Sequence, residues 1–313
     1  MIDTLNMTLT ADRVGGENLL YIVPKNLSNV SEHYNHSSGQ ETCSGFIGGL
    51  KVFVTPYEVK VGKGSFCKWC LGDNLQTLCR SDIKEGIERL SNALHVPMEE
   101  ANVTRLDIAA NIILKHPVEA YLSHLGAMPK KQRFEQPNSL YYKGGSIMVT
   151  FYDKVKERAN AGAAVPEIYN NRNVLRYEVR ILQRLTKALN VPKVTGGLLY
   201  DETFYINIVK LWRSYYTKIQ KVNVIVMDWE RVKTKRELYK VGLLELIEKN
   251  GGQVKAISQI NEAAKMGDLT HKQAHDMREA IREACSTRAG FTKQSPLITE
   301  LNVKINEVSR FFQ

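Results

Sequence analysis

Apolar and polar residues alternate along several short segments in the first two thirds of the chain. In residues 1–9 every second side chain from Leu5 to Leu9 is apolar, and residues 50–61 and 146–154 are β-branched and aromatic runs beside proline or glycine. Successive side chains of a strand point to opposite faces, so a period of two predicts β-strands. We expect these three segments to belong to a sheet.

A period near 3.6 residues appears between these strands. Residues 81–99 carry Ile83, Ile87, Leu90 and Leu94 at helical spacing, open with a Ser-Asp capping signal and stop at a proline. This pattern predicts an amphipathic helix that packs on a sheet. Further strands are expected at residues 103–114 and 175–181, and further helices at residues 118–128 and 182–190. Because helices do not separate every pair of strands, the predicted fold class is α+β with a central antiparallel sheet.

The pattern becomes helical throughout after about residue 225. Four helical segments follow, with breaks at Gly251-Gly252 and at residues 268–270. Glycine and short polar runs end helices, so these breaks separate individual helices. We therefore expect two domains: residues 1–225 with the sheet, and residues 226–313 as a small all-helical domain.

Composition and charge indicate which class of partner the protein binds. The chain has 313 residues, and 43% of them are hydrophobic, which is enough to bury a substantial core. Lys and Arg number 43 against 33 Asp and Glu, and the net charge of +10 favours a polyanionic partner such as nucleic acid. No apolar run reaches the roughly eighteen residues of a membrane span, and no signal-peptide pattern opens the chain. These features predict a cytoplasmic protein without a membrane partner.

Two predicted strands carry polar side chains along one face each. Alternation places Arg105, Asp107 and Asn111 on one face of the first strand, and a charged row on one face of the second. The charged row of the second strand consists of Arg176, Glu178 and Arg180. If both strands lie in one sheet, two carboxylates and three arginines share a surface.

This surface has two interpretations. The rows are either solvated charges that pair across strands, or a site where Asp107 and Glu178 bind Mg²⁺ or Mn²⁺ while the arginines bind phosphate. Asn111 offers a further oxygen ligand. By alternation Asp3 falls on the apolar face of its strand, where a carboxylate is costly unless it is paired or bound to a metal. The alternative for Asp3 is an exposed and solvated strand start.

Tyr152 lies near the end of the strand at residues 146–154, on the same predicted face as Lys154. A phenol has a reference pKa near 10, so a tyrosine nucleophile needs a nearby cation or base to stabilise the phenolate. Lys154 is the candidate cation. The same spacing also suits a tyrosine that packs in a hydrophobic core.

The cysteines and histidines suggest further sites. Five cysteines are an odd count, which favours free thiols over a disulfide framework. Cys67 and Cys70 have the spacing of a zinc knuckle that Cys43 and Cys79 would complete, although a second closely spaced pair is missing. A histidine pair at residues 271 and 275 lacks the glutamate of a zinc-protease motif, and no phosphate-binding loop of the GxxxxGK[ST] type occurs.

Four motifs follow one another in a definite order. They are "MIDTLNMTL", "VTRLDIAANI", "MVTFYDKVKE" and "VLRYEVRI". In order and spacing they resemble the motifs of the filamentous-phage gene II/X replication proteins, which are related to the HUH replication initiators. That family also has a Met-Ile-Asp strand, an Arg-hydrophobic-Asp strand, a hydrophobic-Tyr-x-Lys segment and an Arg-aromatic-Glu-x-Arg strand. The resemblance covers roughly residues 1–220.

The resemblance implies an endonuclease that nicks and closes DNA in rolling-circle replication. The nucleophilic tyrosine of the family matches Tyr152, and its accompanying lysine matches Lys154. Tyr152 is then expected to attack a phosphate of origin DNA, single-stranded or in a hairpin, to give a 5′-phosphotyrosine and a free 3′-OH. A host polymerase would extend that 3′-OH, and a host helicase is a further candidate partner.

The family motifs also bear on the polar strands. The expected metal ligands are Asp107, Glu178, Asn111 and Asp3, and the expected DNA-binding residues are Arg105, Arg176 and Arg180. The His-hydrophobic-His metal motif of the HUH initiators is absent from the chain. An alternative function is a non-catalytic DNA-binding regulator that uses a helix-turn-helix around residues 240–284, and a zinc-dependent interaction module is the third.

Overall fold

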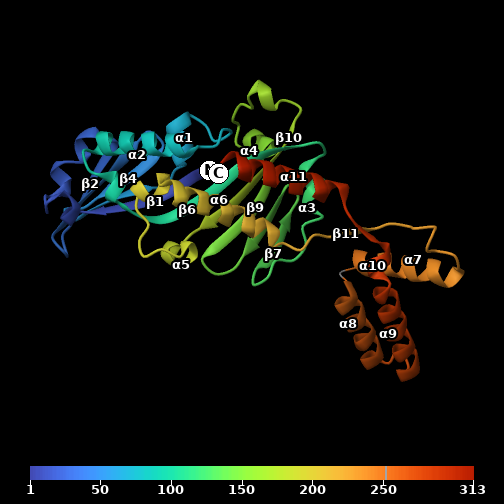
Figure 1. Ribbon diagram of the computed structural model, residues 1–313. Helices are drawn as coiled ribbons and strands as arrows, with labels where there is room; N and C mark the ends of the chain where they lie inside the picture. The colour runs from blue at the N-terminus through green and yellow to red at the C-terminus, as the bar shows by residue number, and fades with distance from the viewer. Residues whose placement is uncertain (251) are drawn as a thin grey trace. The chain divides into compact units, whose positions relative to one another are not determined.

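The computed structural model describes residues 1–250 and 252–313, and it is drawn in Figure 1. The chain divides into two compact units. The first unit contains Met1–Gln220 together with Thr299–Gln313, and the second contains Lys221–Ile298. The predicted helix break at Gly251-Gly252 lies partly outside the described residues, because only Gly252 is described.

The first unit is built on one sheet of ten strands, in which every neighbouring pair is antiparallel. In sheet order the strands are β2 (Ser28–Asn35), β3 (Gln40–Ile47), β4 (Leu50–Val54), β5 (Glu58–Gly62), β1 (Ile2–Thr10), β6 (Asn102–Leu114), β10 (Asn173–Ile181), β9 (Ile147–Asp153), β8 (Ser139–Lys143) and β7 (Gln132–Gln136). The predicted α+β class with a central antiparallel sheet is confirmed.

The helices of the first unit are mostly short. They are α1 (Phe66–Leu71), α2 (Arg80–Leu94), α3 (Val118–Leu122), α4 (Lys154–Asn160), α5 (Leu185–Leu189), α6 (Glu202–Thr217) and most of α11 (Pro296–Phe311). The four apolar positions predicted for α2 are buried, and Cys79 with Asp82 forms the capping box at its start. The helices expected at residues 118–128 and 182–190 are each reduced to five residues, α3 and α5.

Two strand predictions change in detail. The segment at residues 50–61 is a hairpin of β4 and β5, because the Thr55 hydroxyl accepts hydrogen bonds from the backbone N–H groups of Tyr57 and Glu58 and closes a turn. In β1 the register against β6 shifts between Ile2 and Thr4, at Asp3. A bulge of this kind turns a side chain away from strict alternation. Asp3 therefore does not follow the apolar row of Leu5 to Leu9.

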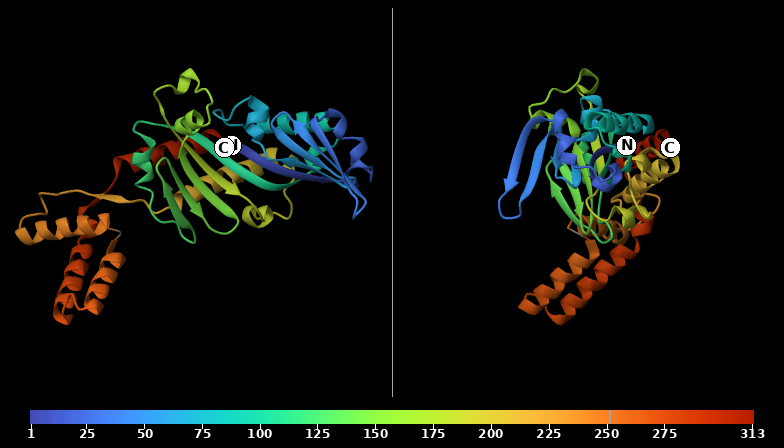
Figure 2. Two further views of the ribbon diagram at one scale, coloured as in Figure 1. Left: turned by 180° about the vertical axis from the view of Figure 1, so that it is seen from behind. Right: turned by 90° about the vertical axis from the view of Figure 1, so that its left-hand side faces the viewer.

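The core lies between one face of the sheet and α6. Tyr177 of β10 stacks on Phe151 of β9 with ring centroids 4.5 Å apart, and its hydroxyl donates to the carbonyl of Trp212 in α6 at 2.8 Å. The Tyr177 and Trp212 ring centroids are 4.6 Å apart. Figures 1 and 2 show α6 and α11 lying on the same face of the sheet. This leaves the polar side chains of β6, β9 and β10 on the opposite face.

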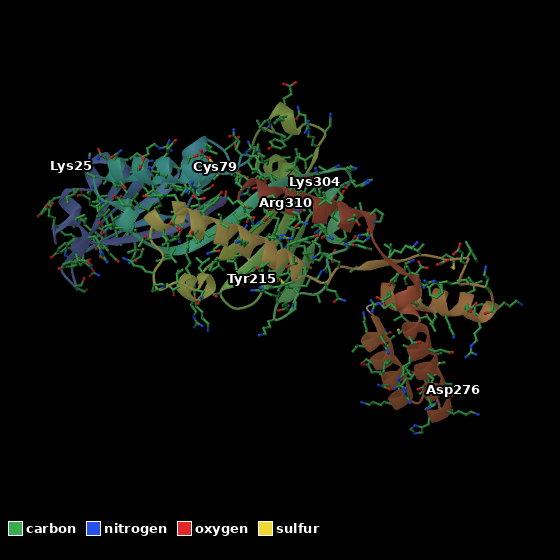
Figure 3. All side chains as sticks on the ribbon, in the orientation of Figure 1. Lys25, Cys79, Tyr215, Asp276, Lys304 and Arg310 are labelled. Atoms are coloured by element: carbon green, nitrogen blue, oxygen red, sulfur yellow. The ribbon has the colours of Figure 1, made fainter. Side chains whose placement is uncertain are left out.

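The last helix belongs to the first unit, whereas the predicted boundary at residue 225 assigns it to the helical domain. Leu301 and Ile305 are buried, and the Glu300 carboxylate accepts hydrogen bonds from the Tyr121 hydroxyl at 2.6 Å and the Lys115 N–H at 3.0 Å. The exposed Arg310 lies on the outer side of the helix (Figure 3). Long-range packing of this kind has no signal in the local helical pattern.

The second unit contains α7 (Lys235–Lys249), α8 (Gly252–Met266) and α9 (His271–Ser286), as the helical pattern predicts, and the short α10 (Arg288–Phe291), which it does not predict. The fourth predicted helix is α11. It also contains a pair of three-residue strands, β11 (Asn223–Ile225) and β12 (Thr292–Gln294), which the pattern does not predict. Leu244, Ile247, Ile281 and Ala284 form its buried cluster.

The linkage of α8 and α9 bears on the helix-turn-helix alternative. Gly267, with φ +87°, opens the short turn between them, and the Thr270 side chain caps α9. The two helices lie side by side along their length (Figures 1 and 2). A DNA-binding helix-turn-helix instead places its helices at a wide angle. The pair is thus an αα-hairpin.

Candidate active site

The candidate residues gather on the sheet face opposite α6. The register pairs Arg176 of β10 with Tyr152 of β9 on one side and with Asn111 of β6 on the other. Further along, Arg180 lies opposite Asp107. The expectation that both polar strands share one sheet and one surface is confirmed.

Arg176 lies at the centre of this surface and only 2% of it is exposed. Its Nε donates to Glu178 Oε1 at 2.7 Å, and its Nη2 lies 2.8 Å from Asp3 Oδ1. Its Nη1 donates to the Asn74 carbonyl at 2.9 Å and to Asn111 Oδ1 at 3.1 Å. Burial acts to lower the pKa of the guanidinium, but the carboxylates of Asp3 and Glu178 raise it overall. Arg176 is a permanent buried cation.

Glu178 is the anion that joins the cluster. Its Oε1 also accepts a hydrogen bond from the Tyr152 hydroxyl at 2.8 Å, and its Oε2 accepts one from Arg180 Nε at 2.6 Å. Burial acts to raise the pKa of this carboxyl, but the guanidiniums of Arg176 and Arg180 outweigh burial and lower it to about 2. Glu178 is therefore ionised at any pH at which the protein works.

Tyr152 has a protonated hydroxyl at rest. Burial raises the pKa of its phenol above the ordinary value, and the Glu178 carboxylate raises it further. Since the hydroxyl donates to Glu178, the phenol is aimed at an acceptor that stays charged. Strand β10 thus supplies Glu178, the hydrogen-bond acceptor that orients the Tyr152 hydroxyl.

Lys154 does not continue the face of Tyr152 as the alternation predicts. Strand β9 ends at Asp153, whose carboxylate accepts hydrogen bonds from the N–H groups of Val155 and Lys156 and caps α4. The buried Lys154 ammonium donates to Glu157 at 2.7 Å and lies 5.9 Å from the centre of the Tyr152 ring. Burial lowers its pKa despite the hydrogen bond to Glu157. The contacts of the Lys154 ammonium are therefore with Glu157 and the face of the Tyr152 ring.

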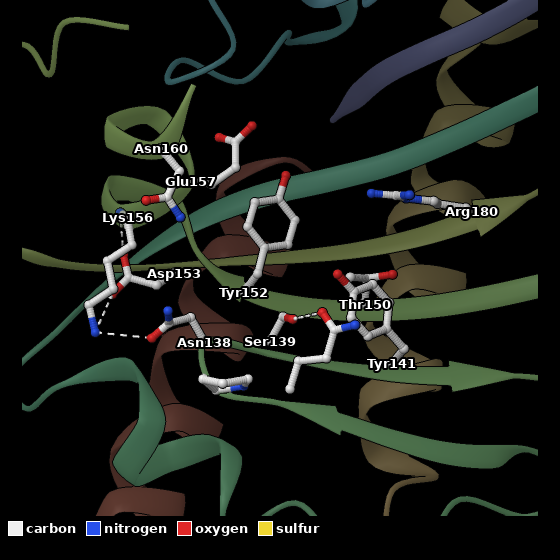
Figure 4. A pocket seen from close by; sticks show the side chains of 12 residues that line it. Asn138, Ser139, Tyr141, Thr150, Tyr152, Asp153, Lys156, Glu157, Asn160 and Arg180 are labelled. Carbon is white, nitrogen blue, oxygen red and sulfur yellow. Dashed lines mark hydrogen bonds and ion pairs between the residues drawn. The ribbon is translucent and has the colours of Figure 1, made fainter. Parts of the chain in front are cut away.

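A hollow of about 440 Å³ opens beside Tyr152. Figure 4 shows the ring standing above β9, with Arg180 on one side and the α4 residues Lys156 and Glu157 on the other. Thr150 also lines the hollow, and its buried hydroxyl has no hydrogen-bond partner among the described residues. The hollow thus offers two cations, Arg180 and Lys156, beside the phenol, and such cations bind phosphate oxygens.

Sequence reasoning missed Lys156, Asn138 and Thr150 as members of this hollow. Lys156 donates to Asn138 Oδ1 at 3.2 Å and pairs with Glu119. The sequence does contain a signal for Lys156. Asp153 is a typical helix-capping residue, and a helix that starts directly after the strand brings its first residues back towards the end of that strand. Asn138 comes close through the pairing of β8 with β9, whereas Thr150 lies two residues before Tyr152 on the same face of β9.

The four expected metal ligands do not converge on one point. The Arg176 guanidinium lies between the Asp3 and Glu178 carboxylates, and Asn111 donates to the carbonyls of Asn74 and Leu75 while it accepts from Arg176. The Asp107 carboxylate takes two hydrogen bonds from Arg105, at 3.0 and 2.6 Å. In residues 1–250 and 252–313 no three His, Cys, Asp or Glu side chains form a metal-binding group. The donor set in this arrangement fits guanidinium groups and does not fit a divalent cation.

The zinc interpretation of the cysteines also lacks a site. Cys67 and Cys70 lie on α1, and all five cysteines are free thiols. Burial raises the pKa of Cys67 to about 12 and that of Cys70 to about 11. Cys67 Sγ donates to the carbonyls of Asp73 and Gln76, and among the described residues no three His, Cys, Asp or Glu side chains come together as a metal-binding group.

The sheet unit of the chain matches a known protein family. A family model described as the N-terminal part of the phage gene II replication-associated protein matches residues 1–215. The chain belongs to this family. The expected resemblance to filamentous-phage gene II-type replication proteins is thereby confirmed. A search of curated proteins found no match.

Membership identifies a phage replication initiator protein of the gene II type. Every residue of the candidate site lies within the matched residues 1–215, whereas the second unit lies beyond them. The part of the chain that the structure describes has no helix long and apolar enough to cross a membrane. DNA at a replication origin is the partner that the gene II family indicates.

Proposed function

We propose that the protein starts rolling-circle DNA replication by nicking one strand of the origin, with Tyr152 as the nucleophile. The observation that carries this proposal is the Tyr152 hydroxyl, hydrogen-bonded to an ionised Glu178 at the wall of a cation-lined hollow. A nucleophile oriented by an adjacent base is the arrangement that covalent catalysis requires. Tyr152 and Glu178 both lie within the residues 1–215 that match the family.

The proposed step exchanges one phosphoester bond for another. The Tyr152 Oη attacks the phosphorus in line, and its proton passes to water, because the ionised Glu178 carboxylate orients the hydroxyl but is too weak a base to hold its proton. The bond from phosphorus to O3′ breaks, and O3′ takes a proton from water and leaves as a 3′-hydroxyl. The 5′ end stays bound as a phosphotyrosine, so the energy of the bond is retained for a later closing attack by a 3′-hydroxyl. A host polymerase extends the free 3′ end.

The cations of the site have two different roles in this proposal. Arg180, whose side chain is 26% exposed, and Lys156, at 48%, line the hollow and bind the non-bridging phosphate oxygens. Arg176 is too deeply buried to touch DNA, so it is a positioning residue that holds Glu178 in place.

The predicted Mg²⁺ or Mn²⁺ stays a prediction, and no part of the proposed step depends on it. Its test is nicking in the presence of EDTA with DNA binding followed in parallel. Binding should survive the chelator, because it rests on cationic contacts to phosphate. If nicking also survives, Asp107 and Glu178 have no role as metal ligands.

The Tyr152→Phe variant tests the nucleophile. We expect it to bind single-stranded origin DNA normally but to form no covalent protein–DNA band in a denaturing gel, because it lacks the attacking oxygen. Tyr141→Phe is the matched control, since Tyr141 of β8 lines the same hollow. That control should keep the adduct and nick at close to the parent rate.

Two outcomes would contradict the proposal. An adduct that persists in Tyr152→Phe and disappears in Tyr141→Phe would assign the chemistry to the other tyrosine of the hollow. Specific origin binding by the parent protein without any adduct would instead favour the non-catalytic regulator.

A further inference from the structure

A second hollow, of about 510 Å³, lies on β1, β4 and β5. We call it the lysine groove, and define it by six lining residues: Asn6, Thr8, Lys51, Phe53, Lys60 and Lys63. It shares no lining residue with the hollow beside Tyr152. The proposed nicking step makes no use of it.

The lysine groove opens on the same face of the sheet as Tyr152. Thr8 of β1 lies opposite Lys60 of β5, which lies opposite Phe53 of β4, while Asn6 lies opposite Arg105 of β6. Three strand-to-strand steps separate β1, the nearest strand of the groove, from β9 in the sheet order. At about 4.8 Å a step, the groove begins roughly 14 Å from the strand of Tyr152.

The groove combines an aromatic floor with a basic rim. Phe53 is 36% exposed although it lies in the middle of a strand. Lys51 and Lys63 form no ion pair within the described part of the chain, and Lys60 pairs with Glu58 of its own strand. An exposed ring stacks on nucleobases, and unpaired lysines bind the phosphates between them. This combination suits a single strand of nucleic acid.

Asn6 supplies an independent observation. Its Oδ1 is buried and has no hydrogen-bond partner among the described residues. The side chain fits because Gly62 lies beside it: a Cβ at Gly62 would approach Asn6 Oδ1 to 2.5 Å. A buried amide oxygen without a partner is costly, and the edge of a base carries the donors that would satisfy it. The groove is therefore polar at one defined point, as a base-binding site requires.

We propose that the lysine groove binds the bases of single-stranded DNA that continues from the phosphate held at Tyr152. The inference rests on the proposed function for the position of that phosphate. A stacked strand rises about 3.4 Å per nucleotide, so about four nucleotides span the interval. Charge favours single-stranded DNA over an apolar peptide as the occupant of the groove, because an apolar peptide would leave Lys51 and Lys63 without counter-charges.

The test measures binding of a fluorescent oligothymidylate of about sixteen nucleotides, long enough to reach both hollows. All proteins carry Tyr152→Phe, so that no strand is cut. We expect Phe53→Ala to weaken binding roughly 5- to 100-fold, which is the loss of one stacked base. Phe53→Trp should restore it. Lys51→Gln and Lys63→Gln should each lower the salt dependence, log Kd against log salt, by about 0.7.

Tyr34→Ala is the matched control. Tyr34 is 47% exposed on β2, and the register of β2 with β3 and β4 turns it to the opposite face of the sheet. Unchanged binding in Phe53→Ala, or an equal loss in Tyr34→Ala, would overturn the inference. Either result leaves the nicking proposal intact if the parent protein forms its adduct. Conversely, a parent without an adduct whose binding still depends on Phe53 contradicts the nicking proposal alone.

Discussion

At the scale of single residues, ion pairs and hydrogen bonds among charged side chains organise the site. Asp3 and Glu178 share the guanidinium of Arg176, and Glu178 also orients Tyr152. The sequence leaves open whether the Asp3 carboxylate is solvated, bound to a metal or paired with another side chain. Only the approach of β10 to the start of β1 settles this, because Arg176 reaches Asp3 across the intervening strand β6.

Arg176→Met tests the buried cation. Removing it leaves the Asp3 carboxylate without its ion pair and leaves Glu178 with Arg180 alone. Breaking a buried pair in this way costs on the order of 3–5 kcal/mol of unfolding free energy. Arg105→Met is the matched control, because Arg105 is 33% exposed and burial raises the pKa of its partner Asp107, which can take up a proton instead. Hydrogen exchange of the backbone amides of β6 and β10 measures the loss of unfolding free energy in both variants. Equal losses in the two variants would contradict the central role of Arg176.

At the scale of elements, the junction of β9 and α4 shapes the hollow. Asp153 ends the strand and caps the helix, so that Lys154, Lys156 and Glu157 turn back beside Tyr152. Strand alternation correctly places Tyr152, but it fails two residues later because the chain changes its period there. The capping preference of aspartate is a local signal for that change, and it is visible in the sequence.

Asp153→Ala tests this junction. Losing a cap costs about 0.5–2 kcal/mol, and small displacements of catalytic groups slow a reaction by on the order of 10- to 100-fold. We expect nicking to fall by that factor. Asp201→Ala is the control: Asp201 caps α6 through the Phe204 N–H at 2.8 Å, on the far face of the sheet. It should lower the melting temperature similarly and leave nicking nearly unchanged, and a matching loss of nicking would refute the positional argument.

At the scale of the whole molecule, the first unit is discontinuous in sequence. Residues 299–313 return to it through Glu300, which binds Tyr121, and through Asn302 and Asn306, which accept hydrogen bonds from Tyr216 and Arg213 at 2.6 and 2.7 Å. The helical pattern cannot show this, since a helix buries the same apolar stripe against either partner. The second unit inserts before the last helix and lies outside the family match.

Two deletions test this organisation. Truncation after Gln220 removes the buried Leu301 and Ile305, and each lost core side chain costs roughly 2–5 kcal/mol, so we expect the sheet unit to unfold at a much lower temperature. Replacing residues 222–297 with a flexible Gly/Ser linker keeps these contacts. That variant should melt near the parent temperature and nick single-stranded DNA. Equal stability of the two variants in calorimetry would show that the last helix is dispensable.

What the sequence by itself determined is local. The strand of Arg105 to Asn111, the helix of Ile83 to Leu94 and the ordered motifs around Tyr152 follow from periods of two and 3.6 residues and from neighbouring side chains. The tertiary structure decided the rest: the partner of Asp3, the burial of Arg176, the strands β2, β3, β7 and β8, and the lysine groove. These depend on strand order and register, which bring together side chains far apart in the chain, and no local period encodes that pairing.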